Sequence, residues 1–121
     1  MKPHEHEHEH EHWAADGGDA ASTVLTIPAD AKRERRFEIA IAATVGVPGD
    51  AKEPWLQVTV LANGTQQWKR RTAAHNPGEY DGLDYRFTRS VPVAQALRVQ
   101  VSVAVGGARR RTLKIEADEI G

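Results

Sequence analysis

The 121-residue sequence contains no cysteine, a single methionine and no long apolar run. Without cysteine the chain can form neither disulfides nor thiolate metal sites. It has no stretch of about 18 apolar residues for a transmembrane helix, so we expect no membrane insertion. The 16 basic and 17 acidic residues nearly cancel. A nucleic-acid-binding domain normally has a clear basic excess, so nucleic acid is disfavoured as a partner.

Histidine is concentrated at the N-terminus, where it alternates with glutamate in MKPHEHEHEHEHW. Clustered imidazoles bind immobilised metal ions, so residues 1–13 are interpreted as a purification tag. The alternative is a native histidine-rich, metal-binding tract. Residues 14–21, AADGGDAA, are small and polar and predict a flexible linker. Residues 14–121 carry 15 basic and 13 acidic residues, a net charge of +2, and residues 22–121 are the predicted domain.

Apolar and polar residues alternate through most of this domain, the period-two pattern of β-strands. Residues 37–45, FEIAIAATV, place an apolar side chain at every second position, and residues 97–105, LRVQVSVAV, do the same. Further strands are predicted at 22–27, 55–62, 65–72, 83–89 and 110–117. No segment has the apolar stripe of an amphipathic helix.

Two glycine-containing pairs predict tight turns between these strands. Asn63-Gly64 separates two strand-like runs and is typical of a type I′ hairpin, and Gly106-Gly107 predicts a second turn. Seven or eight short antiparallel strands cannot bury their apolar faces in one flat sheet. The predicted fold is therefore all-β: an antiparallel two-sheet β-sandwich, jelly-roll-like, with seven to eight strands.

The order of the segments also suggests a family. A valine-rich strand ends at Asn63-Gly64, an aromatic segment follows at 80–87, and LRVQV at 97–101 precedes RTLKI at 111–115 and Ile120. This pattern resembles the small jelly-roll carbohydrate-binding modules of the xylan-binding type. The resemblance implies a noncatalytic polysaccharide-binding module of a larger secreted, periplasmic or cell-surface protein, with neighbouring domains as further partners. It also implies calcium bound by loop carboxylates.

The acidic residues of the segment EYDGLD are candidate calcium ligands: Glu79, Asp81 and Asp84. Calcium prefers several oxygen ligands at flexible spacing, and Gly82 would let the backbone turn around an ion. The alternative is an exposed turn that uses aspartate and glycine for their turn geometry.

Exposed aromatic side chains are the usual platforms for the apolar face of a sugar ring. Trp68, in the otherwise polar QQWKRR, either anchors its strand to the core or stands exposed, and Tyr80 is a second candidate in a loop. Hydrogen bonds to the ligand are predicted from Arg70, Arg71, Asn76 and Asp84. The arginines favour an acidic polysaccharide, and the loops at 46–54 and 73–82 are expected to carry the specificity.

Catalytic chemistry is poorly represented. His75 is the single histidine outside residues 1–13, and no nucleophile-elbow motif occurs, so no enzyme is predicted. The basic runs at 32–36, 69–71 and 109–111 are interpreted as solvated edges that discourage aggregation. If they converged, they would bind nucleic acid or sulfated glycan in a salt-dependent manner. The alternative function is a structural or protein-docking β-sandwich without a small ligand, with Trp68 facing inward.

Overall fold

The computed structural model of the chain describes residues 9–75, 78 and 80–121, and this part contains eight strands and no helix. The strands are β1 (His12–Asp16), β2 (Ser22–Ile27), β3 (Arg35–Gly46), β4 (Trp55–Ala62), β5 (Thr65–Ala73), β6 (Tyr80–Val91), β7 (Leu97–Gly106) and β8 (Arg109–Glu119). The described residues accordingly offer no helix that could cross a membrane.

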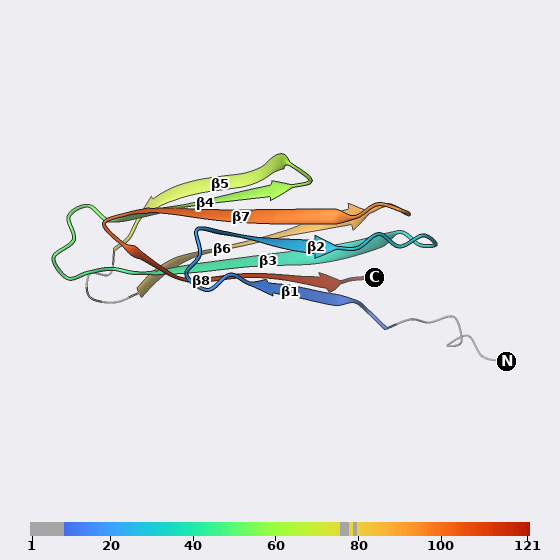
Figure 1. Cartoon of the computed structure of the whole chain (residues 1–121), viewed down its shortest axis with the longest axis horizontal. Coiled ribbons are helices and arrows are strands. Elements are labelled where there is room, and N and C mark those ends of the chain that lie inside the picture. The colour runs from blue at the N-terminus through green and yellow to red at the C-terminus, as the bar shows by residue number, and fades with distance from the viewer. Residues whose placement is uncertain (1–8, 76–77, 79) are drawn as a thin grey trace.

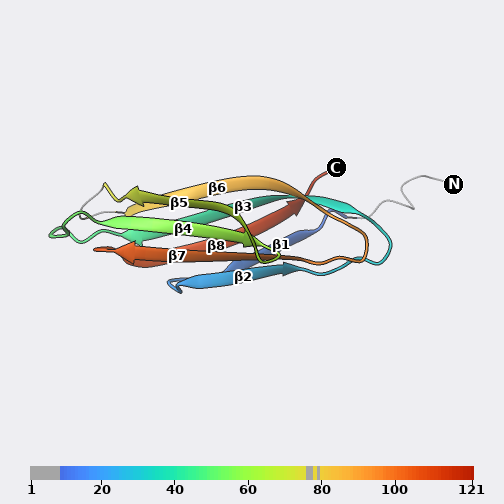
Figure 2. The same cartoon turned by 90° about the horizontal axis from the view of Figure 1, so that it is seen from above.

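Two four-stranded antiparallel sheets face each other, in the orders β1-β8-β3-β6 and β2-β7-β4-β5. Figures 1 and 2 show the long strands running along the molecule in two layers. Only the β4–β5 hairpin joins neighbours within a sheet, and every other described connection crosses between the sheets. This alternation is the jelly-roll arrangement of two interlocked Greek keys, and it confirms the predicted fold.

Period-two burial builds the core. The inward residues of β3 and those of β7 are almost fully buried, whereas their neighbours in the sequence face outward. The largest fully buried side chains are Phe37, Ile27, Ile39, Ile41, Leu56, Leu97, Leu113, Ile115, Val45, Val58, Val60 and Val91. Each such side chain stabilises the fold by about 1.5–3 kcal/mol, so a one-residue slip of either strand would forfeit most of that burial.

Both predicted turns form, but only the first joins two neighbouring strands of one sheet. Asn63 and Gly64 both have positive φ, 47° and 80°, as a type I′ hairpin between β4 and β5 requires. At the second turn Gly107 has φ 65°. There the chain leaves β7 in one sheet and enters β8 in the other, so this turn is a crossing and not a hairpin.

The folded body begins earlier than residue 22. β1 pairs with β8 through Trp13↔Ala117 and Ala15↔Ile115, and both inward residues, Trp13 and Ala15, pack against the core. The predicted domain boundary and the linker over 14–16 are therefore wrong. A three-residue alternation of tryptophan and alanine is too short to be recognised as a strand. The interpretation of residues 1–13 as a tag in origin stays a prediction.

Ion pairs join this N-terminal strand to the rest of the domain. Glu11 binds Arg33 and also Arg35, whose Nη1 lies 2.7 Å from Glu11 Oε1. Arg33 also binds Glu119 at 2.7 Å, a hydrogen bond that raises the pKa of the Arg33 guanidinium. We call these four residues the Glu11 clasp. Arg35 is only 3% exposed. The cost of burying its charge is offset by the ion pair with Glu11 and by the hydrogen bond that it donates to the Pro28 carbonyl.

We predict that Glu11→Gln lowers the free energy of unfolding by about 3 kcal/mol, because it leaves the buried Arg35 charge without its anion. Urea denaturation measures the change. Glu9→Gln, an exposed position of the same His/Glu segment, is the control and leaves the midpoint unchanged. Equal midpoints for both variants would show that the Glu11 carboxylate contributes nothing to the stability of the fold.

Asp30, at the same end of the molecule, makes the stability of the fold depend on pH. Its carboxylate accepts the backbone N–H groups of Lys32 and Arg33, and the Lys32 bond is the main reason that the pKa of Asp30 lies below its ordinary value. A lowered pKa stabilises the fold above about pH 4, and this contribution is lost as the pH falls through the folded-state pKa.

The stability difference between wild type and Asp30→Ala should therefore be constant near neutrality and shrink toward zero in acid. Chemical denaturation at a series of pH values measures it. Asp50→Ala, in an exposed turn, serves as the control. A difference that grows in acid would contradict the assignment.

Candidate functional site

The structure separates the two predicted aromatic platforms. Trp68 on β5 stacks on Tyr85 of β6 with ring centroids 4.3 Å apart and an interplanar angle of 4°, and Tyr85 in turn contacts Phe87 at 5.5 Å. Trp68 is partly buried and packs against the core. One face of its ring is thus covered by Tyr85, across the open side of the sandwich.

A β-bulge accounts for this orientation. Val60 pairs with Trp68 but Leu61 pairs with Gln66, so Gln67 is an extra residue on β5. Trp68 therefore lies opposite the buried Val60 and faces inward. Gln67 donates through Nε2 to the Tyr85 hydroxyl at 3.2 Å, which fixes the tyrosine that Trp68 stacks on.

The two predicted arginines lie on opposite faces of β5. Arg70 pairs with the buried Val58 and shares the side of Trp68, although its own side chain is exposed. Arg71 faces outward, and its guanidinium lies 3.8 Å from the centroid of the Trp55 ring. The predicted binding of a ligand by these two arginines stays a prediction.

The predicted calcium ligands are also separated. Asp81 pairs with the inward-facing Val45, whereas Asp84 pairs with the outward-facing Ala42. The Asp81 carboxylate accepts the backbone N–H groups of His75 at 2.7 Å and Gly82 at 2.8 Å. Within residues 9–75, 78 and 80–121 no group of three ligating side chains could hold a metal ion. Glu79 and the predicted ligand residue Asn76 lie outside the described residues.

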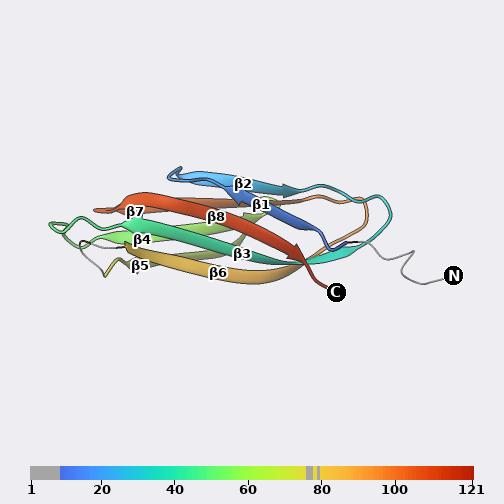
Figure 3. The same ribbon diagram turned by 90° about the horizontal axis from the view of Figure 1, so that it is seen from below.

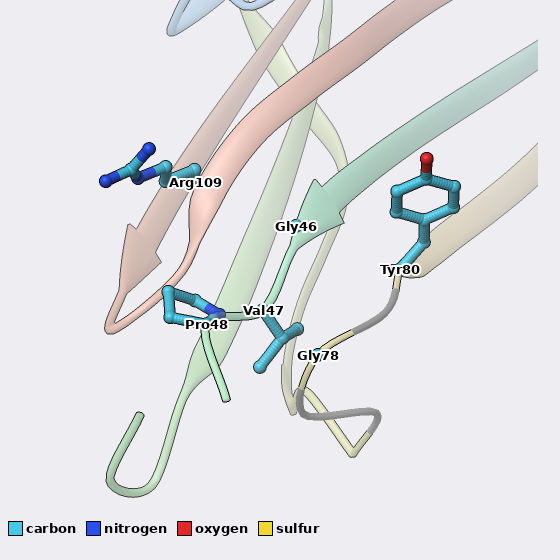
Figure 4. Close-up of a pocket in the computed structure, with 6 residues that line it drawn as sticks. All are labelled: Gly46, Val47, Pro48, Gly78, Tyr80 and Arg109. Carbon is cyan, nitrogen blue, oxygen red and sulfur yellow. The ribbon is translucent and has the colours of Figure 1, made fainter. Parts of the chain in front are cut away.

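Tyr80 lies at a different place from Trp68 and is the most exposed large apolar side chain of the described residues, at 62%. It begins β6 opposite Gly46 of β3, and Gly46 in turn pairs with Arg109 of β8. Figure 4 shows Tyr80 and Arg109 on either side of Gly46. Around them lies an open hollow of about 380 Å³ lined by Gly46, Val47, Pro48, Gly78, Tyr80 and Arg109.

Arg111 completes this site, which we call the Tyr80 hollow. Its guanidinium lies 3.7 Å from the centroid of the Tyr80 ring, a geometry that favours a cation–π interaction. A second bulge makes this possible: Val45 pairs with Arg110 and Thr44 with Thr112, so Arg111 is the extra residue. A Cβ at Gly46 would lie 3.4 Å from Arg111 Cδ. The glycine thus lets the arginine stem cross β3 to the tyrosine.

A similar stack lies at the same end of the domain on the other sheet. The Trp55 ring lies against Gly106, and a Cβ added there would come within 2.8 Å of Trp55 Cζ2 and closer still to Nε1. The Arg71 guanidinium lies over the same ring, 3.8 Å from its centroid. This end of the molecule therefore presents two guanidinium groups, each held on an aromatic ring.

The basic run at 109–111 divides between structure and surface. Arg110 hydrogen-bonds to the backbone carbonyls of Asp19 and Val103 and ties β8 to its surroundings. Arg109 and Arg111 flank Gly46 with no carboxylate partner among the described residues. The run at 32–36 is not simply a solvated edge either, because Arg33 and Arg35 belong to the Glu11 clasp.

The sequence analysis named Tyr80 and the loop at 46–54, which begins with Gly46, but it did not assign Arg109 and Arg111 to the same site. The arginine run was a visible signal. Its relation to Tyr80 was not, because it depends on β8 lying beside β3 and on the bulge at Arg111.

Comparison with known proteins identifies the fold but no family. The sequence matches no known family, and no curated protein is detectably similar to it. The fold is similar to part of dimeric latent PorU from Porphyromonas gingivalis, with a TM-score of 0.50, 14% identity, and 88% of this chain and 10% of that chain covered. The insecticidal delta-endotoxin Cry8Ea1 from Bacillus thuringiensis gives a TM-score of 0.43 and 16% identity, covering 93% of this chain and 20% of that chain. The chain thus spans a fifth or less of the length of these proteins, in which the similar region is one part of a longer chain.

Gly106→Ala should lower the free energy of unfolding by about 2 kcal/mol and change the tryptophan fluorescence, because the new methyl group must displace Trp55. Thermal or urea denaturation and the emission spectrum measure both effects. Gly49→Ala is the control, since a Cβ there meets nothing within 4 Å. Unchanged stability and emission for Gly106→Ala would mean that Trp55 does not lie on residue 106.

Proposed function

We propose that the domain is a noncatalytic carbohydrate-binding module that binds acidic polysaccharide at the Tyr80 hollow. The single observation that carries the proposal is the 62% exposed Tyr80 ring at the rim of an open hollow. Exposed aromatic rings at the end of a rigid sandwich suit the apolar face of a sugar ring.

Charge and hydrogen bonding support an acidic glycan. Arg111 covers part of the Tyr80 ring and Arg109 stands across Gly46, so two guanidinium groups flank the position of a bound sugar. Guanidinium binds carboxylate and sulfate through paired N–H donors. Uronate or sulfated glycans would therefore be preferred to neutral ones, with an affinity that falls as salt rises.

The wider setting is part of the same proposal. A jelly roll that occupies a small part of a longer chain, as in PorU, suits a binding domain carried by a larger secreted or cell-surface protein. No catalytic role is proposed, because none of the described lining residues of the Tyr80 hollow carries a carboxylate, imidazole, amine, thiol or aliphatic hydroxyl.

Calorimetric titration with uronate-bearing, sulfated and neutral oligosaccharides tests the proposal. Tyr80→Ala should weaken binding by about tenfold or more, because the ring supplies the main apolar contact. Arg111→Ala should weaken binding of acidic but not of neutral sugars. Arg98→Ala is the matched control. It removes an exposed arginine near the start of β7, at the end of the domain away from the Tyr80 hollow.

Absence of binding to every glycan, or equal affinity of wild type and Tyr80→Ala, would refute the proposal. The same titrations in calcium and in a chelator test the predicted calcium ligands. Binding that is lost in chelator would support a role for calcium in recognition, and unchanged binding would exclude one.

A further inference from the structure

The outer edge of β6 has no strand partner within the described part of the chain. β6 ends the sheet β1-β8-β3-β6, and it lies along one long side of the molecule in Figures 2 and 3. It has 12 residues, and its pairing with β3 shows no register shift. A long, regular edge presents a row of backbone donors and acceptors that can pair with a further strand.

The other edge strands are poorer templates. β1 has 5 residues and β2 has 6. β5 has 9 residues but carries the bulge at Gln67 and the consecutive cations at 69–71, of which Arg70 points inward. Short strands, bulges and inward charges are the usual means of blocking edge-to-edge pairing. β6 has neither a bulge nor a proline, and its two inward charges, Asp81 and Arg89, are of opposite sign.

The charges of β6 are self-complementary about Tyr85. Asp84 and Arg86 flank this residue at one position on either side, and Asp81 and Arg89 flank it at four positions. An antiparallel pair of two β6 strands centred on Tyr85 therefore places Asp84 opposite Arg86 of the second copy, and Asp81 opposite Arg89. Twofold symmetry makes each pair occur twice, and opposite charges directly across a strand pair are stabilising.

The same register fits the two faces of the sheet. Leu83, Tyr85 and Phe87 pair with the inward residues 43, 41 and 39 of β3, so they share the inner side. About Tyr85, Leu83 meets Phe87 of the second copy, and apolar meets apolar. On the outer side Arg86 binds Glu38 of β3 at 2.9 Å, and the remaining N–H donors of its guanidinium can bind Asp84 of the second copy.

Neighbouring registers lose this match. Centring on Asp84 places the two Asp84 carboxylates opposite each other, and centring on Arg86 does the same with the two guanidinium groups. Like charges directly opposite are destabilising. Registers shifted further leave Asp84 and Arg86 opposite uncharged residues.

We propose that this chain forms a twofold-symmetric dimer by antiparallel pairing of β6 with β6 of a second copy, centred on Tyr85. The pairing joins two four-stranded sheets into one continuous sheet of eight strands. It uses the backbone edge of β6, whereas the Tyr80 side chain lies on the outer face of the sheet, and it does not depend on the proposed function.

Sedimentation of the full chain from micromolar to millimolar concentration tests the dimer. Wild type should show a concentration-dependent monomer–dimer equilibrium that weakens with salt. Asp84→Lys and Arg86→Glu should each raise the dimer dissociation constant by about tenfold or more, since each turns two attractive pairs into repulsive ones. An equimolar mixture of the two variants should recover wild-type affinity, because Lys at 84 then meets Glu at 86.

Glu116→Lys and Lys114→Glu are the matched controls. They change the net charge by the same amounts on β8, on the same outer face of the sheet, and should dimerise as wild type does. Circular dichroism verifies the fold of each variant. A wild type that stays monomeric throughout, variants that dimerise as well as wild type, or a mixture that fails to recover would each overturn the proposal.

Discussion

Every part of this domain depends on the burial of one face of each sheet against the other. A strand such as β3 has inward side chains that are fully buried, but only because β7 and β4 of the opposite sheet cover them. Neither sheet could exist alone in water, since its apolar face would be exposed. The jelly-roll connections strengthen this dependence. All described connections except the β4–β5 hairpin carry the chain from one sheet to the other, so the two sheets must form together.

Because buried apolar side chains fill the space between the sheets, the charged side chains that bind other groups lie at the ends and edges of the sandwich. At one end the Glu11 clasp holds β1 and the C-terminal part of β8 to the start of β3 through a buried arginine. At the other end two arginines lie on aromatic rings and have no described carboxylate partner. Arginine thus stabilises the fold where a described glutamate accompanies it, and the proposed function uses arginines that have no such partner among the described residues.

The sequence predicted the architecture because alternation, the Asn63-Gly64 turn and the absence of helical patterns are all local signals. It failed where a feature depends on which strands become neighbours. Trp68 was ambiguous because the bulge at Gln67 decides its direction, and Arg111 could not be assigned to Tyr80 because another bulge and Gly46 lie between them. β1 was overlooked for a different reason: its two inward residues bury little area, and its position is secured by ion pairs of Glu11 with residues more than twenty positions away.

The Tyr80 hollow and the β6 edge are related because Tyr80 and Tyr85 belong to the same strand. Tyr80 pairs with Gly46 on the outer side of the sheet, five residues from the proposed twofold axis. At about 3.3 Å per residue, a dimer centred on Tyr85 holds its two Tyr80 side chains about 33 Å apart, on the same outer face of one continuous sheet. A short oligosaccharide could reach only one of these sites, whereas a long polymer could occupy both, so dimerisation would increase the avidity for polysaccharide without altering the affinity of either site.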